Sequence, residues 1–186
     1  MSDLRIAIIL GSTRPGRNGK AVADWVLDKS AGRPANYEII DLADYPLPHF
    51  DEAKPPVFGQ YANAHTKNWA ATIARFDGFI FVTPEYNHST SGVLKNAIDY
   101  LHAEWNNKAG AFVGYGSIGG ARAIEHLRGI ASGLQIAHVG QQLSFSIFTD
   151  FEKMSTFAPG PQHAPAADTM FTQLEAWTEA LKPLRG

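Results

Sequence analysis

Five short apolar runs alternate with helical patterns along this chain, and the alternation strongly limits its possible folds. Each run is nearly continuous in apolar residues, as expected of a strand buried on both faces of a sheet. Strands separated by helices favour an α/β three-layer sandwich with a five-stranded parallel sheet. The expected strands are Leu4–Leu10, Tyr37–Asp41, Gly78–Thr83, Gly110–Tyr115 and Gln135–Val139, and the expected helices are Lys20–Lys29, Ala64–Arg75, Gly92–His102, Gly120–Ser132 and Asp168–Leu181.

Length and composition indicate one domain covering residues 1–186. The 186 residues are 45% hydrophobic and 18% charged, which is usual for a globular protein. A net charge of -2 without a basic tail gives no reason to expect nucleic acid. The absence of cysteine excludes disulfides, iron–sulfur clusters and cysteine catalysis. With neither a signal peptide nor a long apolar run, we expect no membrane association and a cytoplasmic location.

Two irregular segments interrupt the alternation of strands and helices. Residues 42–58 contain four prolines, and residues 140–165 form a second stretch rich in proline and glycine. Long irregular segments inside a compact domain are often functional or make subunit contacts. Ligands of a doubly wound sheet bind beyond the carboxyl ends of the strands, where the loops at 11–19, 84–91 and 114–120 should converge.

The first of these loops, LGSTRPGRNGK at residues 10–20, has the composition of a phosphate site. It joins a strand to a helix, so backbone N–H groups and a helix N-terminus point at one place and favour an anion. No hydroxyl residue follows Gly19-Lys20, so a Walker-type nucleotide loop is excluded. A basic surface turn that binds no ligand is the alternative. The candidate phosphate-binding residues are Ser12, Arg14, Arg17, Gly19 and Lys20.

The second loop opens the segment TPEYNHSTSGVLKNAIDY at residues 83–100. Its exposed amides and Tyr86 suit a flat heteroaromatic ring, which needs hydrogen bonds at its edge and an apolar face. Glu85 has two interpretations, as a general base or as a locally paired carboxylate. The third loop, at residues 114–120, spells GxGxxG, but the next strand has no acid to hold a ribose hydroxyl. We interpret it as a third ligand-facing loop, with a tight structural turn as the alternative.

The remaining polar residues give little support for metal or nucleophilic chemistry. The histidines show neither HxH nor HExxH spacing, so no metal site is expected. There is also no recognisable Ser–His–acid arrangement. We therefore assign no catalytic side chain.

Together the three loops resemble those of the NADPH-dependent FMN reductase family, which has the flavodoxin-like fold. The family motif GSxRxxSxN is represented by residues 11–18, with Arg17 in place of the usual serine and the asparagine displaced to position 18. The second motif, PEYNxSxxGxLKNAIDYL, matches residues 84–101 at every defined position. The resemblance covers residues 4 to about 139. It implies that the flavin ring is lined by Pro84, Glu85, Tyr86, Asn87, Ser89, Ser117 and Gly119.

The resemblance further implies a reaction and its partners. FMN takes a hydride from NAD(P)H and passes electrons to a small-molecule acceptor such as a quinone, while the protein orients and tunes the flavin. Members of the family are commonly homodimers or homotetramers. The alternatives are a flavodoxin-like electron carrier, which is usually more acidic than this chain, and a non-catalytic flavin-binding protein.

Overall fold

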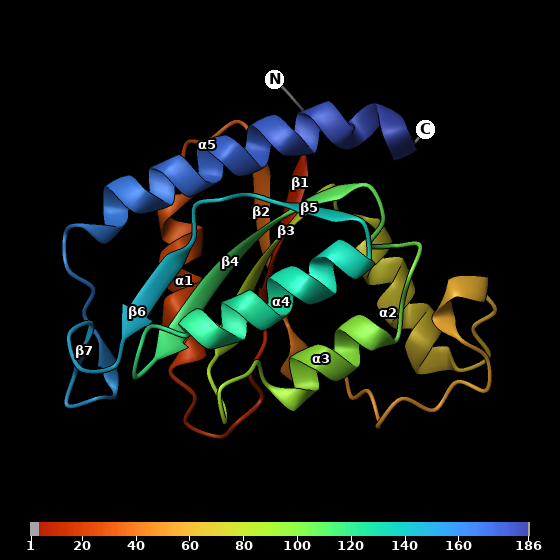
Figure 1. Ribbon diagram of the computed structural model, residues 1–186, viewed down its shortest axis with the longest axis horizontal. Helices are drawn as coiled ribbons and strands as arrows, with labels where there is room; N and C mark the ends of the chain where they lie inside the picture. The colour runs from red at the N-terminus through yellow and green to blue at the C-terminus, as the bar shows by residue number, and fades with distance from the viewer. Residues whose placement is uncertain (1–3, 186) are drawn as a thin grey trace.

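The computed structural model describes residues 4–185, which form a three-layer α/β sandwich around a parallel sheet (Figure 1). The strand order β2-β1-β3-β4-β5 is the flavodoxin-like order, as predicted. The predicted strand boundaries agree with the observed ones to within two residues. The strands are β1 (Arg5–Leu10), β2 (Asn36–Asp41), β3 (Gly78–Pro84), β4 (Lys108–Gly116) and β5 (Ile136–His138).

Each face of the sheet buries its own hydrophobic core, because successive side chains of a strand point to opposite faces. In β1, Ile6 and Ile8 face one core, whereas Ala7 and Ile9 face the other. The first core is closed by α1 (Gly19–Lys29) and α5 (His163–Leu181). The second is closed by α2 (Ala64–Ala74), α3 (Gly92–Asp99) and α4 (Ala121–Gly133).

The segment at 140–165, expected to be irregular, contains three short strands. β6 (Leu143–Ser146) pairs in parallel with the last four residues of β4, whereas β5 pairs with its first three. The sheet edge is therefore two short strands in succession. β7 (Phe151–Glu152) and β8 (Thr156–Phe157) form a hairpin beyond it. Runs as short as these give too weak a pattern to recognise from sequence.

Helix α5 begins at His163, five residues before the predicted start at Asp168. The sequence predicts an irregular segment at Pro165, but this residue lies in the first turn of the helix. The backbone N–H groups of a first turn have no intrahelical acceptor, so proline costs little there.

Residues 4–185 also contain three 3₁₀ turns: η1 (Leu42–Asp44), η2 (Pro56–Phe58) and η3 (Lys182–Arg185). Within residues 4–185, every helix is too short or too polar to cross a bilayer.

Candidate functional site

The first loop leaves β1 at the carboxyl edge of the sheet and enters α1. The Gly11 amide donates to the Val82 carbonyl at 2.9 Å, and a Cβ on Gly11 would lie 2.8 Å from that oxygen, so the close approach requires glycine. Beyond this point, the backbone amides of Ser12, Thr13 and Arg14 donate to no acceptor among residues 4–185. Three neighbouring donors thus remain available for an anion.

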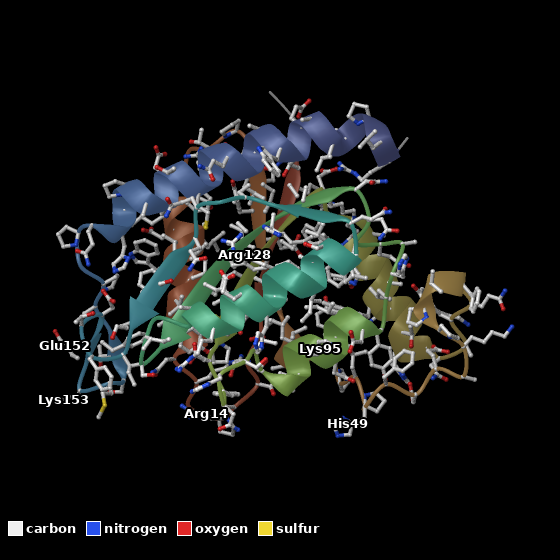
Figure 2. The ribbon with its side chains drawn as sticks, viewed as in Figure 1. Arg14, His49, Lys95, Arg128, Glu152 and Lys153 are labelled. Carbon is white, nitrogen blue, oxygen red and sulfur yellow. The ribbon has the colours of Figure 1, made fainter. Side chains whose placement is uncertain are left out.

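The three basic residues of this loop are used differently. Arg17 donates from Nη1 to Asp41 at 2.9 Å and also contacts the Ser12 carbonyl, so its charge is already balanced. Lys20 pairs with Asp24 one turn along α1, with 2.7 Å between Nζ and Oδ2. The Arg14 guanidinium has no hydrogen-bond or ion-pair partner in the described part of the chain and extends from the carboxyl edge of the sheet (Figure 2).

The second loop makes a tight turn directly after β3. The backbones of Tyr86 and Ser89 exchange two hydrogen bonds, of 2.9 and 3.0 Å. Asn87 and His88 between them have positive φ values of 50° and 67°, and their amides donate to no acceptor within residues 4–185. Ser91 then caps α3 and donates to the Gly11 carbonyl, which joins this loop to the first.

Glu85 pairs with the start of α4, 37 residues further along the chain. Its carboxylate accepts from the Arg122 amide at 3.1 Å and from the Arg122 Nε at 2.7 Å. Burial alone would raise the pKa of Glu85, but the hydrogen bonds from Arg122 outweigh it, and the pKa lies below its usual range. The buried carboxylate therefore stays charged and hydrogen-bonded to Arg122. This fits a paired carboxylate and not a general base.

The third loop is a compact turn between β4 and α4. Gly119 and Gly120 have φ values of 70° and 73°, and a Cβ on Gly120 would lie 2.8 Å from the Gly114 Cα. The Ser117 carbonyl accepts from the Ser146 hydroxyl at 3.3 Å, which ties the turn to β6. The close packing of the backbone in this turn therefore explains why the loop contains glycines.

A cavity of about 790 Å³ opens at the carboxyl edge beside the first two loops. Of the candidate cofactor-binding residues, three line it: Ser12, Arg14 and Tyr86. The others are not among its lining residues: Arg17, Gly19, Lys20, Pro84, Glu85, Asn87, Ser89, Ser117 and Gly119. One side is the first loop, the second is Tyr86 with the start of α3, and the third is the proline-rich segment after β2. The lining residues are Ser12, Thr13, Arg14, Leu47, Pro48, His49, Tyr86, Ser91, Gly92, Val93, Lys95, Asn96 and Asp99.

Sequence reasoning did not place residues 47–49, Lys95, Asn96 or Asp99 in a site. The run of prolines at 42–58 was the available signal for the third wall, since such segments are often functional. Its position beside the first loop depends on the strand order, with β2 next to β1.

The donors of the first loop fit a phosphate monoester such as that of FMN. Three free amides, the Thr13 hydroxyl and an unpaired guanidinium surround one end of the cavity. The Tyr115 hydroxyl, buried against Gly19, has no hydrogen-bond partner within residues 4–185. An unsatisfied buried hydroxyl beside an anion site is a further available donor.

Comparison with known proteins identifies the family. The sequence profile of the NADPH-dependent FMN reductase family matches residues 4–150. An NAD(P)H-dependent FMN reductase from Nectria sp is 44% identical over 126 residues, which are 64% of this chain and 63% of that protein. A 2-hydroxy-1,4-benzoquinone reductase from Burkholderia sp is 35% identical over 74% of this chain and 75% of its own. In structure, a flavoenzyme NAD(P)H:(acceptor) oxidoreductase from Paracoccus denitrificans aligns with a TM-score of 0.73 at 21% identity, covering 95% of this chain and 98% of its own.

The chain therefore belongs to the NADPH-dependent FMN reductase family. The membership confirms the predicted class, an FMN-dependent NAD(P)H oxidoreductase, with FMN as cofactor and NAD(P)H as co-substrate. It does not favour the electron carrier or the non-catalytic flavin-binding protein.

Proposed function

We propose that this chain binds FMN at the carboxyl edge of its sheet, takes a hydride from NAD(P)H and reduces a quinone or a similar small acceptor. The observation that carries this proposal is the first loop, whose free amides and unpaired Arg14 lie beside the 790 Å³ cavity. The quinone is supported by the Burkholderia relative, which is named a benzoquinone reductase.

In this proposal the first loop holds the FMN phosphate. Ser12 and Arg14 contact it, together with the loop amides. Arg17 and Lys20, which the sequence also predicts to contact the phosphate, have other roles in this proposal. Arg17 shapes the loop through Asp41 and the Ser12 carbonyl, and Lys20 pairs with Asp24 on the surface. Gly19 lets the start of α1 approach the Tyr115 hydroxyl, because a Cβ there would lie 2.5 Å from that oxygen.

The second and third loops hold the flavin ring. Pro84, Glu85, Tyr86, Asn87 and Ser89 lie along one edge of the ring, with the free amides of the turn as donors. Ser117 and Gly119 of the third loop, which lie outside the lining of the cavity, complete the proposed set of ring contacts. The bound FMN supplies hydride acceptance and electron transfer, and no side chain is assigned an acid–base role.

Two further expectations stay predictions. The first is a homodimer or homotetramer, with α3 and its neighbouring loops as the contact. The second is a cytoplasmic location.

The phosphate assignment is tested by Arg14→Ala. A charge-assisted phosphate contact contributes about 1.5–3 kcal/mol, so we expect FMN to bind about 10- to 100-fold more weakly. Flavin fluorescence titration measures this dissociation constant. Riboflavin lacks the phosphate, and its affinity should be the same for both proteins.

Lys20→Ala is the matched control, since it removes a basic residue of the same loop that already has an acidic partner. We expect its FMN affinity to change by no more than about twofold. An Arg14→Ala protein with unchanged FMN affinity, or with riboflavin and FMN weakened equally, would contradict the assignment of the loop.

A further inference from the structure

The third wall of the cavity, residues 47–49, lies outside both FMN motifs. The first loop and the Tyr86 side account for FMN in the proposed function, and the segment after β2 faces the same space. It contributes Leu47, Pro48 and His49. A second ligand that meets the flavin in this cavity would therefore contact this wall.

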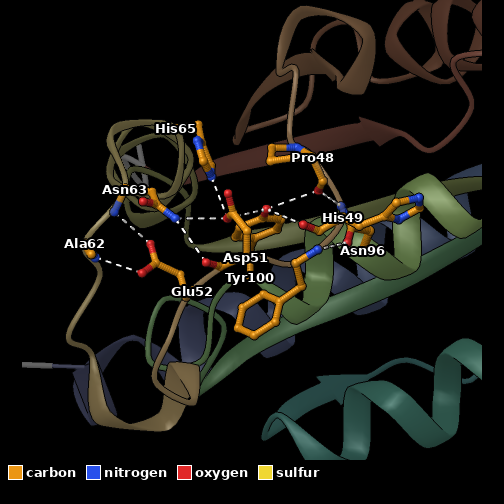
Figure 3. Close-up of polar contacts among 10 residues, drawn as sticks. Pro48, His49, Asp51, Glu52, Ala62, Asn63, His65, Asn96 and Tyr100 are labelled. Atoms are coloured by element: carbon orange, nitrogen blue, oxygen red, sulfur yellow. Dashed lines mark hydrogen bonds and ion pairs between the residues drawn. The ribbon is translucent and has the colours of Figure 1, made fainter.

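Asn96 of α3 and Tyr100, the residue directly after this helix, hold the segment (Figure 3). Asn96 donates from Nδ2 to the Pro48 carbonyl at 2.7 Å and accepts from the Phe50 amide at 3.0 Å. One turn later, the Tyr100 hydroxyl lies 2.9 Å from Asp51 Oδ1 and 3.1 Å from the Pro48 carbonyl. The Asn96 amide and the Tyr100 hydroxyl thus hold residues 48–51 at both ends.

The outgoing end of the segment is anchored to the start of α2. Asp51 Oδ1 lies 2.9 Å from His65 Nε2, and this contact, with that of Tyr100, lowers the pKa of Asp51. The Glu52 carboxylate accepts from the Ala62 and Asn63 amides at 2.9 and 3.0 Å. Burial would raise the pKa of Glu52, but these amide donors outweigh it and lower the pKa. Both carboxylates are therefore charged at neutral pH and hold the loop.

His49 is exposed at the tip of the segment, between the Pro48 carbonyl and the Phe50 amide that Asn96 holds. Its ring has no hydrogen-bond partner within residues 4–185 and points away from the Asp51 cluster (Figure 3). In either neutral tautomer one ring nitrogen donates. Leu47, Pro48 and Val93 offer apolar contact beside it. This combination suits a flat apolar ring that carries carbonyl oxygens.

We propose that Asn96 and Tyr100 are positioning residues that fix residues 47–49 as a rigid wall, and that this wall determines which quinones are accepted beside the flavin. The inference rests on the proposed function. A wall fixed through four backbone and side-chain contacts limits the width of the acceptor, and His49 presents a donor to its carbonyl oxygen.

The test compares Tyr100→Phe and Asn96→Leu with the wild-type protein loaded with FMN. Steady-state rates are measured at saturating NAD(P)H with one-, two- and three-ring quinones. Loss of one or two backbone contacts should raise the KM for small quinones about 3- to 10-fold in both variants. In Tyr100→Phe, whose side chain does not line the cavity, kcat and the FMN dissociation constant should stay nearly unchanged. Discrimination against the three-ring quinone should decrease in both variants.

Tyr61→Phe is the matched control. The Tyr61 hydroxyl donates to Glu104 at 2.8 Å and forms no hydrogen bond with residues 47–51. This substitution removes a comparable phenol hydrogen bond from the same region, and we expect the variant to keep the wild-type KM values and quinone selectivity.

The outcomes separate the two proposals. Variants that bind FMN normally and keep the wild-type KM and quinone selectivity would overturn the positioning role while leaving the proposed function in place. The positioning role would also be overturned if Tyr61→Phe changed quinone selectivity as much as Tyr100→Phe does. A wild-type protein that neither binds FMN nor oxidises NAD(P)H would overturn the proposed function, and this inference with it.

Discussion

Lys108 is a charged residue placed almost wholly inside the protein, at the start of β4. Its exposed fraction is 5%, its Nζ donates to the Ile73 carbonyl at 3.2 Å, and it lies 5.3 Å from the centre of the Phe79 ring. Burial, with repulsion from Arg185, lowers its pKa from 10.5 to about 8. Below that pKa the folded protein contains a poorly solvated ammonium, which costs stability.

We expect Lys108→Met to stabilise the protein at pH 7. The unfolded chain binds the Lys108 proton up to about pH 10.5, whereas the folded chain releases it near pH 8, so wild-type stability should rise between these values. The variant should lack this rise. At pH 7 its free energy of unfolding should be about 1–3 kcal/mol higher than that of the wild type. This is less than the free energy equivalent to the full pKa shift, because the Ile73 carbonyl loses its hydrogen-bond donor in the variant.

Urea unfolding at pH 7 and pH 10 measures both effects. The exposed Lys67 on α2 provides the control, since Lys67→Met should change the free energy of unfolding by less than about 0.5 kcal/mol at either pH. A Lys108→Met protein that is less stable than wild type at pH 7 would show that the ammonium is well accommodated.

At the scale of elements, Glu85 connects the second loop to the start of α4. The N-cap residue of that helix, Gly120, has no side chain to accept from the first-turn amides. The Glu85 carboxylate does so from another part of the chain, at 3.1 Å from the Arg122 amide, and pairs with the Arg122 side chain. The Glu85 side chain is 5% exposed, whereas the Arg122 side chain is 39% exposed, so it is the carboxylate that is shielded from water.

Glu85→Gln should lower the free energy of unfolding at pH 7 by about 1–3 kcal/mol, because a buried charge-assisted contact becomes a neutral one. The folded pKa of Glu85 lies below its ordinary 4.5, so this stabilisation is present above 4.5 and is lost as the pH falls through the folded pKa. The difference between the two proteins should therefore shrink on acidification.

Chemical denaturation from pH 7 down to pH 3 tests this dependence. Glu125→Gln on the same helix is the control, because Glu125 is exposed and its pair with Arg128 spans 3.4 Å. A Glu85→Gln deficit that stays constant down to pH 3 would contradict the charged pairing.

The elements were largely predictable, whereas the partners of individual side chains were not. Apolar periodicity placed the five strands and α1 to α4 to within three residues, because burial imposes it locally. Lys20 and Asp24 lie four apart on a helix, so their pairing could also have been foreseen. The contact of Arg17 with Asp41 required knowing that β2 lies next to β1. The hydrogen bond from Asn96 to the Pro48 carbonyl joins residues 48 positions apart, and no local sequence pattern predicts it.

At the scale of the whole molecule, the cavity exists only when the complete sheet has formed. Its walls come from the loops after β1, β2 and β3 together with α3, so segments from residues 12 to 99 must be placed at once. In the unfolded chain these walls are not held together, so the cavity does not exist. A ligand of the cavity should therefore bind the folded protein alone and stabilise the domain as a unit.

FMN at 100 times its dissociation constant should raise the free energy of unfolding by about 2.7 kcal/mol. For a domain of this size, the corresponding rise in Tm is about 5–10 °C, and removal of FMN by dialysis should reverse it. Riboflavin at the same concentration should give a smaller rise, because it makes no phosphate contact with the first loop. Differential scanning calorimetry measures both shifts. If FMN binding is saturated by fluorescence while the Tm stays at the ligand-free value, the flavin does not bind the assembled cavity.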